Sequence, residues 1–175
     1  DVDATKILLI EDKAEVNAVD KDKFTALHFT AWKGHVDVAK VLIQNGAGVS
    51  AVNKDNATAL HVASVNGRVD VAKVLIQNGA DVNAVDDWKS TALHHAASKG
   101  FDDVAKVLLR NGADVNAIQG EKNIDMSALH LAAVYKHADV VKVLLQNGAD
   151  VNAVMDVSGK KRTALYFASE KGKTH

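Results

Sequence analysis

Apolar residues along this chain recur with the spacing of short amphipathic helices. In the stretch 26–33, Leu27, Thr30 and Ala31 fall on one side of a helix. Thr25 comes directly before this stretch, and its hydroxyl is suited to accept a hydrogen bond from a free amide of the first turn. The pattern therefore predicts a short helix that begins after Thr25.

A second helix is predicted after Gly34, a residue suited to end the first helix in a left-handed conformation. Asp37 suits the positive end of this second helix, and Asn45-Gly46 stops it. Its apolar stripe consists of Val38, Val41 and Leu42. The polar stretch 47–57 has no apolar period, which predicts a projecting, hairpin-like turn.

This helix-turn-helix pattern is repeated along the whole chain. The Thr-Ala-Leu-His motif or a close variant begins at Thr25, Thr58, Thr91, Ser127 and Thr163. The starts are 33, 33, 36 and 36 residues apart. Helix pairs this short cannot bury an apolar face alone, so they must stack on their neighbours. We expect one domain over 1–175, with a half unit at 1–18, four full units starting near 25, 58, 91 and 127, and a half unit at 163–175.

The repeated motifs resemble the ankyrin repeat. Besides Thr-Ala-Leu-His, the sequence Gly-Ala-Asp-Val-Asn-Ala begins at Gly79, Gly112 and Gly148. The resemblance covers essentially the whole chain and implies an all-α solenoid of stacked helix-turn-helix units with projecting hairpin loops. The chain contains no proline where the family usually has Thr-Pro-Leu-His, but alanine is the best helix former, so the fold prediction stands. Gly48 and Ser50 replace the usual Asp and Asn of one turn, and Lys136 replaces a helix-ending glycine. We expect fraying at these departures from the family pattern.

The amino-acid composition argues against several classes of function. The formal net charge of -1 argues against a nucleic-acid binder, which needs a basic face. The absence of cysteine excludes disulfides and thiolate-ligated zinc. No stretch approaches the roughly 20 apolar residues of a membrane span. These features predict a monomer without membrane insertion, located in the cytoplasm, or in a host cytosol if the chain is an effector.

Four histidines occupy the same place in successive units and invite a metal or catalytic hypothesis. Successive units hold them too far apart to share one ion at about 2 Å per ligand. The resemblance implies instead that each histidine bonds to its own helix cap and to the neighbouring turn. The structural pairs are Thr25 and His28, Thr58 and His61, Thr91 and His94, and Ser127 and His130. No nucleophile elbow, phosphate loop or calcium loop is present, so we expect neither catalysis, nor a metal, nor a cofactor.

The remaining positions point to binding of another protein. The resemblance implies contacts through hairpin tips and the exposed, concave face of the first helix. Aromatic side chains are over-represented at binding hot spots, and the two longer tips each contain a methionine. The predicted contact residues are Phe24, Trp32, Lys33, Trp88, Ser90, Lys99, Met126, Tyr135 and Met155.

The sequence thus predicts a non-catalytic scaffold for protein-protein interaction, whose partner is another protein. One alternative is a targeting module cut from a larger enzyme or toxin-like effector polypeptide. Another is an engineered repeat binder: near-identical blocks such as 36–47 and 69–80 favour it, whereas the irregular spacings oppose it.

Overall fold

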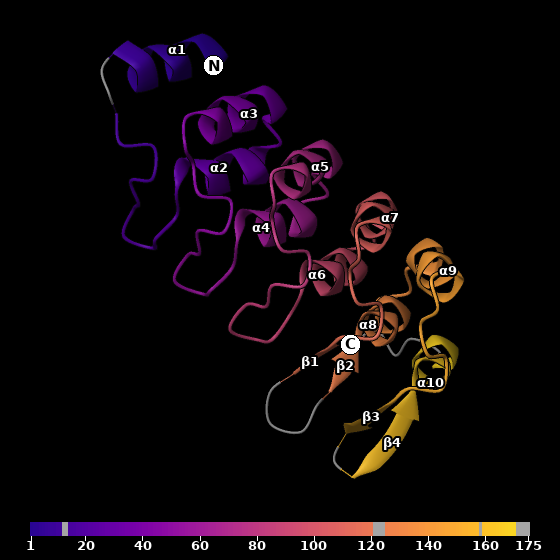
Figure 1. Cartoon of the computed structure of the whole chain (residues 1–175). Coiled ribbons are helices and arrows are strands. Elements are labelled where there is room, and N and C mark those ends of the chain that lie inside the picture. Colours follow the sequence, from indigo (N-terminus) through magenta and orange to yellow (C-terminus); the bar gives the residue numbers. More distant parts are fainter. Residues whose placement is uncertain (12–13, 121–124, 158, 171–175) are drawn as a thin grey trace.

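The chain forms a row of antiparallel helix pairs in a computed structural model, which describes residues 1–11, 14–120, 125–157 and 159–170. The first helices of the units stack on one another in one layer, and the second helices form a second layer (Figure 1). The first helices are α2 (Ala26–Lys33), α4 (Ala59–Val65), α6 (Ala92–Lys99), α8 (Ala128–Val134) and α10 (Ala164–Ser169). The second helices are α3 (Val36–Gln44), α5 (Val69–Gln77), α7 (Asp102–Arg110) and α9 (Ala138–Gln146). The predicted all-α solenoid is confirmed.

The chain begins with α1 (Val2–Lys6), which is followed by a π-helical turn (Ile7–Glu11). This helix packs against α3 and extends the layer of second helices by one position. At the other end, α10 packs against α8. The last five residues of the predicted half unit at 163–175 lie outside the described residues.

One continuous apolar core runs between the two layers. Four of the first helices, α2, α4, α6 and α8, each contribute a fully buried leucine two residues after the cap, and small residues follow on the same face. These leucines are Leu27, Leu60, Leu93 and Leu129. Alanine lets neighbouring helices approach closely, which explains why so few aromatic residues are needed in this core.

The projecting tips lie beyond the layer of first helices, all on one side (Figure 1). In the first three units they are irregular turns. In the two longer copies they are short antiparallel hairpins, β1 (Ile118–Gln119) with β2 (Met126–Ser127) and β3 (Val154–Val157) with β4 (Lys160–Thr163). The extra residues therefore extend the tips and leave the helical layers unchanged.

The helix end at Lys136 differs from the prediction. Gly100 ends α6 with φ of 80°, and Lys136 takes the same left-handed conformation with φ of 61°. The amide of Lys136 still bonds to the carbonyl of Ala133 at 3.2 Å, and the amide of His137 bonds to Ala132 at 2.8 Å. These two bonds close the helix, so the expected fraying was wrong.

Candidate functional site

The repeated histidines connect each first helix to the tip that follows it. The amide of Thr25 donates to Nδ1 of His28 at 3.2 Å, so the ring proton is on Nε2. That Nε2 donates to the carbonyl of Ala57 at 3.1 Å, 29 residues further along the chain. The same arrangement recurs with His61, which reaches Ala84 at 3.0 Å, and with His94, which reaches Ala117 at 3.0 Å. The tips that follow α2, α4 and α6 are therefore tied to the first helix of the preceding unit.

The fourth histidine departs from this series. His130 bonds to its own cap, Ser127, as the others do. Its Nε2 is buried, and among the described residues it has no hydrogen-bond partner. The tip that follows it is the longer β3–β4 hairpin. The backbone of Ala153 and Arg162 lies close enough to act on the pKa of His130, but neither carbonyl forms a hydrogen bond of normal geometry with Nε2.

Burial keeps these histidines neutral. It lowers the pKa of His94 from 6.5 to about 4, even though hydrogen bonds with the carbonyls of Ala117 and Met126 act in the opposite direction. Burial also lowers the pKa values of His28, His61 and His130. In His28, His61 and His94 both ring nitrogens form hydrogen bonds. A neutral imidazole bonded in this way is a poor base and a poor ligand, so these three histidines hold the fold together.

The tips are also tied to one another. One side-chain oxygen of Asp20, Asn53 or Asp86 accepts two backbone amides within its own tip, at 2.9 to 3.0 Å. Backbone bonds then join neighbouring tips, from Lys54 to Asp22 at 3.0 Å and from Asp87 to Asp55 at 3.1 Å. The tips and the outward side of the first helices therefore form one preformed surface, which we call the tip-side surface.

The tip-side surface contains an apolar groove between the first and second units, which we call the first groove. Its volume is about 420 Å³. Phe24, Phe29 and Trp32 line one side, and Val62 and Val65 line the other. The ring centroids of Phe29 and Trp32 are 6.4 Å apart, and both side chains are nearly half exposed. Large apolar side chains that are exposed to solvent and clustered in this way are typical of a binding surface.

A second groove of about 430 Å³ lies between the third and fourth units. Trp88 from one tip and Tyr135 from the end of α8 line it, together with Met126 and Leu131. The exposed fractions of Trp88 and Tyr135 are 51% and 56%. His95 adds a polar group to the lining of this second groove.

Most of the predicted contact residues lie on the tip-side surface. Trp32, Lys33, Trp88, Lys99 and Tyr135 are exposed, and the half-buried Phe24 and Met126 line the grooves. The ammonium of Lys33 stacks over the ring of Trp32 at 3.9 Å. The prediction therefore identified aromatic residues that two separate grooves bring together.

Ser90 and Met155 are both only 4% exposed and offer little surface to a partner, although Ser90 borders the second groove. The hydroxyl of Ser90 bonds to the side chain of Gln119, and its amide bonds to Asp86. Met155 lies on β3, where the alternation of a strand turns it inward between the exposed residues Val154 and Asp156. Position in a tip did not distinguish inward from outward side chains.

Two features of this surface were missed from the sequence. Phe29 lies four residues after its cap, a position that faces the first groove. His95 occupies the corresponding position in the third unit, and its Nε2 lies 2.8 Å from a carboxylate oxygen of Asp86. Comparing the fourth residue after each cap would have found both, because this position faces a groove in each case.

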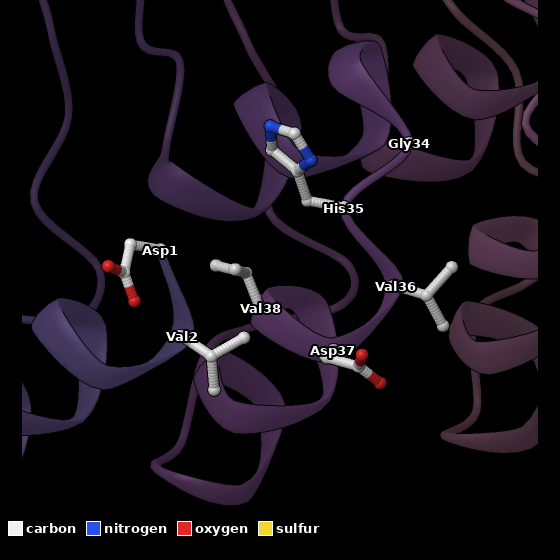
Figure 2. A pocket seen from close by; sticks show the side chains of 7 residues that line it. All are labelled: Asp1, Val2, Gly34, His35, Val36, Asp37 and Val38. Atoms are coloured by element: carbon white, nitrogen blue, oxygen red, sulfur yellow. The ribbon is translucent and has the colours of Figure 1, made fainter.

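A hollow of about 400 Å³ lies elsewhere, between the starts of α1 and α3 (Figure 2). Its two carboxylates already have partners. Asp1 accepts the amide of Asp3 at 2.8 Å, and Asp37 pairs with Lys40 at 3.5 Å. The hollow lies on the layer of second helices, away from the tips, and we do not consider it the functional site.

The motif, the helix pairs and the histidine series agree with the comparison to known families. A family model for ankyrin repeats matches residues 1–86 and 84–155, in three copies. This chain belongs to the ankyrin repeat family. Ankyrin repeats are generally modules for protein-protein interaction. Comparison with curated proteins finds no match.

No described helix is long and apolar enough to cross a membrane. Among the described residues, no three His, Cys, Asp or Glu side chains are placed so that they could hold a metal ion together. The grooves and their aromatic side chains are therefore the features with which we connect function.

Proposed function

We propose that this protein is a non-catalytic, monomeric scaffold that binds a partner protein across its tip-side surface. The observation that carries the proposal is the pair of grooves, each lined by exposed aromatic side chains. Large, stiff side chains such as Trp32, Trp88 and Tyr135 bury much apolar area at a small cost in conformational entropy.

The rigidity of the surface supports the same function. The histidine bonds and the bonds between tips already fix the geometry in the free protein. A preformed surface avoids the entropy cost of ordering loops when the partner binds. Most of the free energy of contact is then available for affinity.

The test begins with a pull-down by the full chain and identification of the partner by mass spectrometry. The affinity of that partner is then measured for Trp32→Ala, Trp88→Ala and Tyr135→Ala. A hot-spot residue should cost about 2 kcal/mol or more of binding free energy.

Lys73→Ala and Lys106→Ala are the matched controls on the layer of second helices. In the described structure both lysines make largely exposed ion pairs within their own helices, and such pairs contribute little to stability. Both variants should bind like the unmodified protein. Loss of affinity in these controls, with none in the aromatic variants, would overturn the proposed surface.

A further inference from the structure

The carboxylate of Asp86 is almost completely enclosed. Its side chain is 1% exposed. Oδ1 accepts the amides of Trp88 at 3.0 Å and Ser90 at 2.9 Å, while Oδ2 lies 2.8 Å from Nε2 of His95. Burial would raise the pKa of Asp86, but the hydrogen bonds from His95 and Ser90 outweigh it and lower that pKa. A negative charge is therefore held behind His95.

The neighbouring unit shows that the tip itself does not require this charge. Asn53 takes the place of Asp86 there, and its amide oxygen accepts the amides of Asp55 at 3.0 Å and Ala57 at 2.9 Å. One neutral oxygen is enough to form the tip. The second carboxylate oxygen of Asp86 is bonded to the side chain of His95.

His95 stands where the other full units have apolar residues. The corresponding positions are occupied by Phe29, Val62 and Leu131. Nε2 of His95 is engaged with the carboxylate of Asp86, which leaves Nδ1 as the other polar atom of the ring. Among the described residues Nδ1 has no hydrogen-bond partner, and it is not one of the buried unsatisfied atoms. It is the polar atom that the ring offers to the second groove.

The described residues that line the second groove with His95 include no positively charged side chain. The other lining residues include no Lys, Arg, Asp or Glu. His61 lies edge-on with ring centroids 5.7 Å apart, and burial lowers its pKa. Burial also lowers the pKa of His94, the preceding residue, to about 4. Near neutral pH both rings are uncharged, so neither offsets the charge of the Asp86 carboxylate.

We propose that the second groove binds an arginine side chain of the partner protein. A guanidinium N–H donates to Nδ1 of His95, and its positive charge complements the carboxylate of Asp86. The flat guanidinium lies against the ring of Trp88 or Tyr135, since such cations stack on aromatic faces. This inference rests on the proposed function and specifies what the partner places in one groove.

The experiment uses the full chain and two short peptides, acetyl-Gly-Arg-Gly-amide and the same peptide with citrulline in place of arginine. Citrulline keeps the shape of the side chain and removes its charge. Binding is followed by NMR as shifts of the resonances of Trp88, His95 and Tyr135. We expect saturable shifts with the arginine peptide and at least about tenfold weaker binding of the citrulline peptide.

Three variants locate the effect. Asp86→Asn should weaken binding of the arginine peptide about tenfold, and Asn53 shows that the tip can form without the charge. His95→Val, which copies Val62, should weaken it similarly. Asp87→Asn removes an exposed carboxylate of the same tip that does not line the groove, so it should bind normally. Thermal unfolding of each variant verifies that it is folded.

Three outcomes would contradict the proposal. Equal binding of both peptides, shifts elsewhere on the surface, or an unchanged affinity of Asp86→Asn would overturn the inference.

The two proposals fail separately. If the pulled-down partner depends on Trp32 and Trp88 but not on Asp86 and His95, the arginine inference fails and the scaffold function stands. If the partner is indifferent to all tip-side variants while the arginine peptide still requires Asp86, the scaffold function fails and the arginine site stands.

Discussion

Nε2 of His94 lies 3.0 Å from the carbonyl oxygen of Ala117, so a side chain buried in the third unit holds the turn that leads into the fourth. This bond requires a neutral ring whose proton is on Nε2. The same requirement applies to His28 and His61, which make equivalent bonds. Connections between units in this protein therefore depend on the protonation state of buried histidines.

The first prediction is a loss of stability in mild acid. The unfolded chain protonates His94 near pH 6.5, whereas the folded chain does so only near the lowered pKa of about 4. In this window the unfolded state binds more protons, so the free energy of unfolding falls as the pH falls from about 6.5 to about 4. His94 alone accounts for on the order of 3 kcal/mol, at about 1.4 kcal/mol for each pKa unit.

Urea unfolding at a series of pH values measures this loss. His94→Gln should flatten the pH dependence, and His35→Gln, which removes an exposed histidine, should leave it as it is. A free energy of unfolding that stays constant over the whole window would contradict the prediction.

The second prediction concerns Ser64, which is completely buried with a hydroxyl that has no described hydrogen-bond partner. The corresponding positions in the other full units are Ala31, Ala97 and Ala133. Ser64→Ala removes an unsatisfied polar group and adds no bulk to the core. It should therefore raise the free energy of unfolding by about 1 kcal/mol. Ala97→Ser is the reverse control and should lower it. Chemical denaturation that shows Ser64→Ala to be destabilising would argue against this view.

The third prediction repairs a missing connection between turns. Asn83 donates to the carbonyl of Gly112 at 3.0 Å and accepts the amide of Asp114 at 2.8 Å. Ser50 occupies the corresponding position one unit earlier, and no such bond joins it to the next turn in the described structure. Ser50→Asn should add these bonds and stabilise the protein by about 1 kcal/mol.

Asn83→Ser is the reciprocal control for this repair, and it should cost a similar amount. Both changes are measured by thermal and urea unfolding. If Ser50→Asn leaves the free energy of unfolding unchanged while Asn83→Ser lowers it, then other contacts hold the turn that contains Ser50.

The fourth prediction uses the left-handed conformation of Lys136. A side chain at φ of 61° is strained by about 1 kcal/mol, and glycine is not. Lys136→Gly should therefore stabilise the protein by roughly that amount. Gly112→Ala tests the same cost in reverse, because Gly112 has φ of 88° and an added Cβ would meet nothing within 4 Å. If Gly112→Ala is harmless, backbone strain does not explain the result at Lys136.

The sequence alone determined the architecture, because local signals repeat in every unit. Thr25 and its counterparts begin the first helices, Gly34 ends one, and the apolar stripes predict where the helices pack. These signals act over one or two helical turns, so the local sequence is sufficient to predict the helices. The aromatic side chains on the surface were also found this way, since helix period and tip position indicate which side of a unit they occupy.

The tertiary structure decided which tip side chains are available to a partner. Ser90 and Met155 face inward because of bonds and strand pairing with residues of other segments. The pairing of Asp86 with His95 likewise depends on how a tip folds back over the next helix. Such relationships arise between segments that only folding brings together, and the spacing of residues along the chain does not encode their distances.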